Sequence, residues 1–249
     1  MYGYFEIQAK IGITKHMGGM EATRKLLEMC GVDKADYVLV VGSGNGVSAI
    51  KIYKMTGCKV LGVDNSEDMV LRAREKLEPQ NKGVEFQLGN VENLDFPDGI
   101  FDVVISESVT GFTDKTRSIS EYYRVLKSGG YVGLNEVTWL SDPSPELDRY
   151  CRRVMGLVAE TKKDWLHLLD KAGFNDMKSS THALNQWKQV RSDLELQSMD
   201  FFRIWARFFI LYFKEPEYRR SIHNLAWEAL HIPRGFNRYF GYGIYVGQK

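Results

Sequence analysis

The stretch that decides the fold is Tyr37-Val38-Leu39-Val40-Val41, which is followed at once by Gly42-Ser43-Gly44-Asn45-Gly46. A short run of consecutive apolar residues is typical of a parallel strand that is buried on both faces. Three glycines at alternate positions remove side chains where backbone must come close to a ligand. We therefore expect a nucleotide-like group to bind at this turn.

A second strand and a carboxylate support this interpretation. Residues 59–63 form another apolar run, and Asp64 stands at its carboxyl end, about 20 residues after the glycine turn, where a carboxylate can accept hydrogen bonds from ribose hydroxyls. A carboxylate in this place can also cap a turn, so both readings stay open. Val47 occupies the position of the third glycine in the dinucleotide fingerprint, which disfavours a dinucleotide.

The rest of the chain alternates strands with helices. Apolar runs predict further strands at 84–88, 101–106, 131–137, 176–184 and 242–247, and apolar periodicity predicts a helix at 21–30 and others between the strands. Ser66 is expected to cap one helix, Thr161 and Asp164 to cap another that ends at Gly173, and Gly129-Gly130 to stop a third. This order predicts a doubly wound α/β fold.

Several of these segments, taken together, resemble the class I S-adenosylmethionine-dependent methyltransferases over residues 14–182. Besides the glycine turn and Asp64, the matching segments are Leu88-Gly89-Asn90-Val91-Glu92-Asn93-Leu94, Phe101-Asp102-Val103-Val104-Ile105-Ser106 and Arg124-Val125-Leu126-Lys127-Ser128-Gly129-Gly130. The resemblance implies a seven-stranded, mostly parallel sheet whose last strand is antiparallel. We expect one domain, 1–249, with an N-terminal helical segment at 1–34, a cofactor-binding core at 35–184, a helical cap inserted at 185–240 and a final strand at 241–249.

The resemblance also implies S-adenosylmethionine as the cofactor and assigns its contacts. The glycine turn would approach the methionine part, Asp64 would hold the ribose, Asn65 and Met69 would flank the adenine, and Asn90 and Val91 would bond its edge. The segment His16-Met17-Gly18-Gly19 resembles an H-x-G-G entrance that meets the cofactor carboxylate, although His16 as a cap or surface residue stays equally open. The full predicted set is His16, Gly18, Gly19, Gly42, Ser43, Gly44, Gly46, Asp64, Asn65, Met69, Asn90, Val91 and Ser106.

Two positions depart from the family pattern. Val40 stands where an acidic residue that organises the loop is frequent, and Asn90 stands where aspartate is usual. An asparagine still offers a carbonyl acceptor, whereas valine removes a carboxylate. Altered cofactor binding, or a cofactor-binding module without catalysis, is therefore an alternative to an enzyme.

The predicted activity is methyl transfer to a small-molecule acceptor by in-line displacement, driven mainly by proximity and orientation. Glu107, just past the fourth strand, is the first candidate for a general base, with a capping or surface role equally open. Residues 1–20, 138–160 and 185–240 are expected to close over the cofactor. The aromatic residues of the cap either pack it onto the sheet or line a pocket, and together with Arg203, Arg207, Arg219 and Arg220 they suggest an apolar quinone or lipid-like acceptor as an alternative.

Composition limits the remaining classes of function. The 249 residues are 44% hydrophobic with a net charge of +1, which disfavours a nucleic-acid partner. Three cysteines without C-x-x-C spacing suggest neither a disulfide framework nor a metal site. We find no signal peptide and no membrane-spanning run in the sequence, so a cytoplasmic protein is expected, compatible with transient membrane contact.

Overall fold

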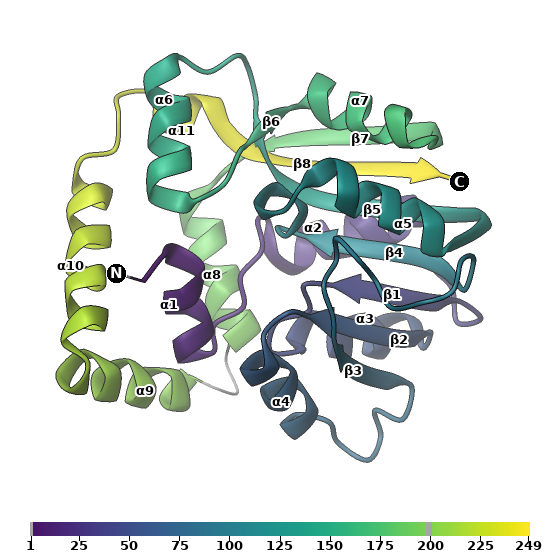
Figure 1. Cartoon of the computed structure of the whole chain (residues 1–249), viewed down its shortest axis with the longest axis horizontal. Helices are drawn as coiled ribbons and strands as arrows, with labels where there is room; N and C mark the ends of the chain where they lie inside the picture. Colours follow the sequence, from purple (N-terminus) through teal and green to yellow (C-terminus); the bar gives the residue numbers. More distant parts are fainter. Residues whose placement is uncertain (1, 198–200) are drawn as a thin grey trace.

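A computed structural model describes residues 2–197 and 201–249 and has one sheet at its centre (Figure 1). The strand order is β3-β2-β1-β4-β5-β8-β7, and the first five strands run parallel. β8 is antiparallel to both of its neighbours. The strands are β1 Tyr37–Val41, β2 Lys59–Asp64, β3 Val84–Leu88, β4 Phe101–Glu107, β5 Leu126–Trp139, β7 Asn175–Ala183 and β8 Phe240–Gln248, and a two-residue β6, Glu160–Thr161, pairs with β5. The predicted fold class is confirmed.

Two layers of helices cover the faces of the sheet. One core cluster joins alternate residues of the central strands, such as Val38 and Ile105, to α2 (Gly19–Cys30), α3 (Val47–Thr56) and α4 (Glu67–Glu75). The opposite face, which includes Leu39 and Val104, packs on α5 (Lys115–Val125) and α7 (Lys162–Ala172). Burial on both faces explains why these strands are continuous apolar runs.

Local signals set most helix ends as expected. The Ser66 side chain accepts a hydrogen bond from the Met69 amide at the start of α4, and Thr161 and Asp164 form a capping box on α7. One boundary is wrong. The helix predicted to reach Gly129-Gly130 ends at Val125, because Leu126 already pairs with Phe101 as the first residue of β5.

A helical insertion lies between β7 and β8. It contains α8 (Gln186–Gln197), α9 (Phe201–Lys214), α10 (Pro216–Leu230) and the short α11 (Phe236–Tyr239). Helix α1 (Tyr4–Ile11), whose position we did not predict, lies inside the segment 1–34 that we expected to be helical, and it packs against α9 and α10 through Ile7 and Ile11. Between β5 and β6 the chain forms α6 (Pro145–Tyr150) and one π-helical turn (Cys151–Met155). The helical cap before the last strand is confirmed, whereas the exact division at residues 34, 184 and 240 stays a prediction.

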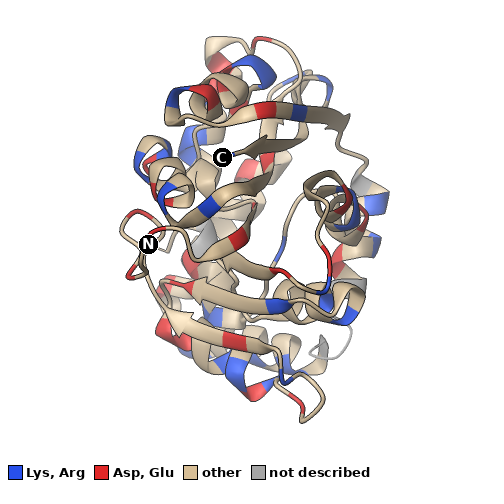
Figure 2. Ribbon diagram, turned by 90° about the vertical axis from the view of Figure 1, so that its right-hand side faces the viewer, with Lys and Arg blue, Asp and Glu red and all other residues tan. Residues whose placement is uncertain are grey.

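Charged residues of both signs are interspersed in the view of Figure 2. In the part of the chain that the structure describes, no helix has the length and apolarity needed to cross a membrane.

Candidate functional site

The glycine turn and Asp64 meet at the carboxyl edge of the sheet. The Gly44 amide donates to Asp64 Oδ2 at 2.7 Å, and the Ser66 amide donates to Oδ1 at 3.0 Å. Burial raises the pKa of the Asp64 carboxyl, and the backbone hydrogen bonds oppose that shift in part. The carboxylate therefore both caps the turn and lies where a ribose is expected.

The glycines of the turn have distinct neighbours. Gly42, Gly44 and Gly46 all have positive φ, which favours glycine. A Cβ at Gly42 would collide with Val109, and one at Gly44 would collide with Thr14, so segments from elsewhere in the chain lie directly on this backbone. Gly46 instead faces Phe86 in the core, which makes its role structural in this geometry.

A segment before α2 covers the turn. The Thr14 hydroxyl accepts from the Asn45 amide at 3.0 Å, and Asn45 Nδ2 donates to the Gly12 carbonyl at 2.8 Å. Arg72 of α4 donates to the Ala9 carbonyl and so ties down the end of α1. The structure thus brings the start of the chain onto the predicted cofactor site.

The predicted adenine contacts lie along the ends of β2 and β3. Met69 and Val91 are buried, whereas Asn65 and Asn90 are exposed. Asn90 Oδ1 accepts from the Glu92 amide at 3.0 Å, so the acceptor expected for adenine closes a turn in this structure. Among the described atoms the buried Ser43 hydroxyl has no hydrogen-bond partner.

A buried chain of hydrogen bonds joins His16 to Glu107. Thr23 Oγ1 lies 2.6 Å from Glu107 Oε1 and 3.1 Å from His16 Nε2, and His16 Nδ1 lies 3.5 Å from the Ser48 hydroxyl. A hydroxyl has one proton and a carboxylate is only an acceptor. Thr23 therefore donates to Glu107, and we assign the proton on His16 to Nε2, from which it is donated to Thr23.

These hydrogen bonds leave one oxygen of Glu107 without a partner among the described atoms. Glu107 is 8% exposed, and its Oε2 makes no hydrogen bond to the described atoms. An unsatisfied buried carboxylate oxygen is costly, so it points to a ligand or water that satisfies it. The sequence prediction had named Glu107 and His16 separately, and the structure brings them together, with Nε2 and Oε1 3.6 Å apart. Thr23 and Ser48 were missed.

A second buried carboxylate, Glu136 of β5, holds the loop that follows β4. Its Oε1 accepts from the amides of Val109 and Thr110 and from the Ser106 hydroxyl, and its Oε2 accepts from the Gly111 amide. Burial raises its pKa to about 6. Because the Ser106 hydroxyl is fully buried in these bonds, a cofactor contact from Ser106 would have to come from its backbone.

The same loop contacts the predicted entrance segment. The Met17 amide donates to the Ser108 hydroxyl at 3.2 Å, and Asn135 Nδ2 donates to the Met17 carbonyl at 2.8 Å. Gln189 of α8 clamps the other side, because its Nε2 donates to the His16 carbonyl and its Oε1 accepts from the Gly18 amide. Gly19 has no side chain, and Ser192 occupies the space that a Cβ at Gly19 would fill. Backbone groups of residues 16–18 are thus tied to the sheet and to the cap.

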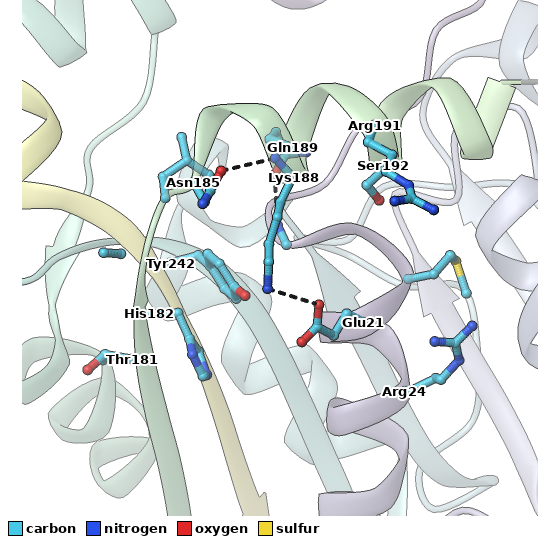
Figure 3. Close-up of a pocket in the computed structure, with 14 residues that line it drawn as sticks. Glu21, Arg24, Thr181, His182, Asn185, Lys188, Gln189, Arg191, Ser192 and Tyr242 are labelled. Atoms are coloured by element: carbon cyan, nitrogen blue, oxygen red, sulfur yellow. Dashed lines mark hydrogen bonds and ion pairs between the residues drawn. The ribbon is translucent and has the colours of Figure 1, made fainter.

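A cavity of about 670 Å³ opens beside this segment, between α2, α8 and the ends of β7 and β8 (Figure 3). Its lining includes three cationic side chains and one carboxylate, namely Arg24, Lys188, Arg191 and Glu21. Lys188 Nζ lies 4.0 Å from Glu21 Oε2, and the His182 and Tyr242 rings stack at 5.1 Å between centroids. The cavity shares Gly18 with the predicted cofactor site.

Comparison with known proteins agrees with this geometry. A family model described as a methyltransferase domain matches residues 38–130, from β1 to the start of β5. An arsenite methyltransferase of Halobacterium salinarum is 31% identical over 180 residues, which cover 65% of this chain and 46% of that protein. Residues 38–130 therefore form a methyltransferase domain, and the chain is similar to class I S-adenosylmethionine-dependent methyltransferases. The predicted enzyme class and cofactor are confirmed.

Solved structures of similar fold extend the likeness to nearly the whole methyltransferase chain. A phosphoethanolamine N-methyltransferase 2 of Haemonchus contortus in complex with S-adenosylmethionine has a TM-score of 0.71 at 19% identity, covering 98% of this chain and 57% of that one. The [4+2]-cyclase SpnF has a TM-score of 0.76 at 18% identity, with 98% and 92% covered. The same fold thus occurs in a protein named for another reaction, so the acceptor and chemistry must be argued from the site.

The residues of this methyltransferase fit the cofactor. A carboxylate suited to ribose hydroxyls stands beside a turn whose glycines have no room for side chains, and an unsatisfied carboxylate oxygen lies on the neighbouring strand. Val40, the departure from the family pattern, lies in an apolar core cluster. A carboxylate at that position would be buried among apolar side chains.

Proposed function

We propose that this methyltransferase transfers a methyl group from S-adenosylmethionine to a small-molecule acceptor. The observation that carries the proposal is the pairing of the glycine turn with Asp64, joined by the bond from the Gly44 amide. The cofactor supplies a methyl group on a positively charged sulfur. The chain spans less than half of the length of the arsenite methyltransferase that it matches, so that protein's name says nothing of the acceptor of this chain.

The work of the protein is to place the acceptor atom in line with the methyl group and to exclude water. The bonds from Gln189 and Asn135 to residues 16–18 fix the entrance segment between the sheet and the cap. Residues 12–16 lie on the glycine turn and would have to remain close to a bound cofactor to shield it. Ordered cover of this kind supports catalysis by orientation.

Glu107 is the residue to receive a proton where the acceptor must lose one. Thr23 and His16 occupy the Oε1 side, whereas Oε2 makes no bond within the described structure. As the new bond to the methyl carbon forms and the bond to sulfur breaks, the acceptor proton would pass to Oε2. Ser48, His16 and Thr23 are positioning residues in this scheme, because they act through the carboxylate.

The cationic cavity beside Gly18 supports an acceptor with an anionic group. Arg24, Lys188 and Arg191 outnumber the single carboxylate Glu21 at its lining. Charge-assisted hydrogen bonds from such side chains favour carboxylate or phosphate. A small acceptor held there would lie next to the entrance segment.

The test combines binding and transfer. Calorimetry should show saturable binding of S-adenosylmethionine, and a panel of acceptors with and without an anionic group should show transfer of a labelled methyl group. Glu107→Gln should lower the rate of transfer and leave cofactor affinity within about an order of magnitude, whereas Glu85→Gln, an equal charge change on an exposed residue of β3, should change neither. Absence of binding would refute the proposal, and binding without transfer to any acceptor would favour a non-catalytic cofactor-binding module.

An apolar quinone or lipid-like acceptor is the second candidate. It is favoured by the large apolar side chains that α9 leaves exposed. Transfer to a lipid-like acceptor in vesicles, without transfer to water-soluble anionic acceptors, would select it. A cytoplasmic location and the absence of nucleic-acid binding stay predictions.

A further inference from the structure

Helix α9 has two apolar stripes, and the first packs inside the molecule. Phe208, Leu211 and Tyr212 pack in one cluster with Ile7 and Ile11 of α1 and Tyr218 of α10. Ile204, one turn earlier on the same side of the helix, is also buried. The inner stripe thus packs α9 onto α1 and α10.

The second stripe of α9 faces outward. Phe202, Trp205, Phe209 and Phe213 follow one another at intervals of three, four and four residues, which places them on one face of a helix. Their exposed fractions are 86%, 46%, 50% and 71%, and Ile210 beside them is also exposed. A contiguous set of large exposed apolar side chains usually marks an interaction surface. We call these five residues the outer stripe.

Cations lie along one side of the outer stripe. At 100° per residue, Arg203, Arg207 and Lys214 fall in a single row between the outer and inner stripes, and α9 contains no Asp or Glu. Arg203 and Lys214 are exposed, and Arg207 is half-buried near Gly12. Aromatic side chains on one face with Lys and Arg beside them are the pattern of a helix that lies in a membrane interface.

We propose that α9 docks on the surface of an anionic membrane through the outer stripe. The aromatic rings would enter the boundary between headgroups and acyl chains, while the cationic row contacts the anionic headgroups. A second copy of the chain fits less well, because its α9 brings no acidic residue to meet the row. Membrane binding through the outer stripe does not require methyl transfer, so sedimentation tests it separately from the proposed function.

The position of α9 gives this contact a consequence for the site. α9 packs on α1, and α1 leads directly into the segment that covers the glycine turn (Figure 1). Docking would therefore hold the covering segment close to the lipid surface. A protein bound in this way can meet acceptors that partition into the membrane.

The proposal is tested by co-sedimentation of the full chain with vesicles. We expect binding to vesicles of phosphatidylcholine and phosphatidylglycerol in equal parts, weaker binding to phosphatidylcholine alone, and a decrease with salt. The double variant Phe209→Ser/Phe213→Ser should lose roughly tenfold or more in partitioning, since two aromatic side chains no longer enter the interface. The double variant Arg203→Gln/Lys214→Gln, which keeps Arg207, should lose most of the preference for the anionic vesicles.

Met177→Ser is the matched control, because Met177 is an exposed apolar residue on β7 at the far edge of the sheet, and it should bind as the unmodified chain does. The thermal midpoint of each variant shows that it is folded. The proposal is overturned by absence of sedimentation with the anionic vesicles. It is also overturned if light scattering shows a dimer that Phe209→Ser/Phe213→Ser converts to a monomer, since the outer stripe would then be an interface between copies.

Discussion

Replacement of Asp64 by asparagine tests the centre of the proposed cofactor site. Oδ2 of Asp64 accepts a hydrogen bond from the Gly44 amide at 2.7 Å, and Oδ1 accepts one from the Ser66 amide at 3.0 Å. The asparagine side chain offers one oxygen and one NH₂ group, so the backbone N–H of either Gly44 or Ser66 would face a donor in place of an acceptor. An unsatisfied buried donor costs about 1 to 3 kcal/mol, and the free energy of unfolding should fall by about that amount.

The cofactor should lose affinity by a separate route. A hydrogen bond to a charged group contributes about 1.5 to 3 kcal/mol, so loss of one ribose contact should raise the Kd about tenfold to a hundredfold. Calorimetric titration with S-adenosylmethionine and S-adenosylhomocysteine should show the same factor for both, because they share the ribose. Asp68→Asn makes the same charge change on an exposed residue of α4 and should alter stability by less than about 0.5 kcal/mol. If Asp64→Asn is folded and binds within about twofold of the unmodified chain, a ratio that corresponds to only about 0.4 kcal/mol of binding free energy, Asp64 does not hold the ribose.

Three further predictions concern single side chains. Gly44→Ala should abolish cofactor binding and destabilise the chain more than Gly31→Ala, because Gly31 also has a positive φ but nothing lies within 4 Å of a Cβ built there. Gly31→Ala should cost about 1 kcal/mol, and chemical unfolding of both variants measures the difference. Thr23→Val removes the donor to Glu107 and should lower the free energy of unfolding by about 1 to 3 kcal/mol. If Thr23→Ser keeps the stability that Thr23→Val loses, the loss is due to the hydroxyl. Burial raises the pKa of Glu136 from 4.5 to about 6, so its protonation stabilises the folded chain fully below about pH 4.5, and this stabilisation is lost as the pH rises through 6. The loss of unfolding free energy in Glu136→Gln should therefore be about 2 kcal/mol larger at pH 4 than at pH 7. An equal loss at both pH values would contradict the shifted pKa.

The parts of the fold that the sequence predicts well are those with sharp local signals. β1 and β3 have the predicted bounds, because each is a short run closed by turn residues. The end of α5 was wrong because Leu126 continues the helical period of Ile119 and Tyr122 while pairing with β4. The position of helix α1 was missed because the helix is short and its apolar residues face α9 and α10, which come about 200 residues later.

In the candidate site too, the sequence predicts residues that belong to local motifs and misses residues whose partners are distant in the chain. The glycine turn, Asp64 and Glu107 stand at the ends of strands, and His16 belongs to a motif before a helix; the structure gathers them at one edge of the sheet. Thr23 and Glu136 were visible only as polar residues inside apolar patterns, in α2 and in β5. A buried polar residue demands a partner, but the sequence does not say which one, because Thr23 and Glu107 are 84 residues apart.

The position of the carboxylates bears on how the methyl transfer would be catalysed. Val40 puts an apolar side chain where the family often has an acid, while Asp64 and Glu107 place carboxylates at the ends of the two strands that flank β1. A carboxylate close to the positive charge of S-adenosylmethionine would favour binding of the cofactor, but that charge would be dispersed in the transition state of methyl transfer, so the attraction would weaken there. Electrostatic attraction alone therefore cannot account for rate enhancement. In the proposed mechanism, acceleration comes from orientation and, where the acceptor has a proton to lose, from Glu107 Oε2 accepting it. The hydrogen bond that Thr23 donates to the other oxygen would then position the carboxylate for this step.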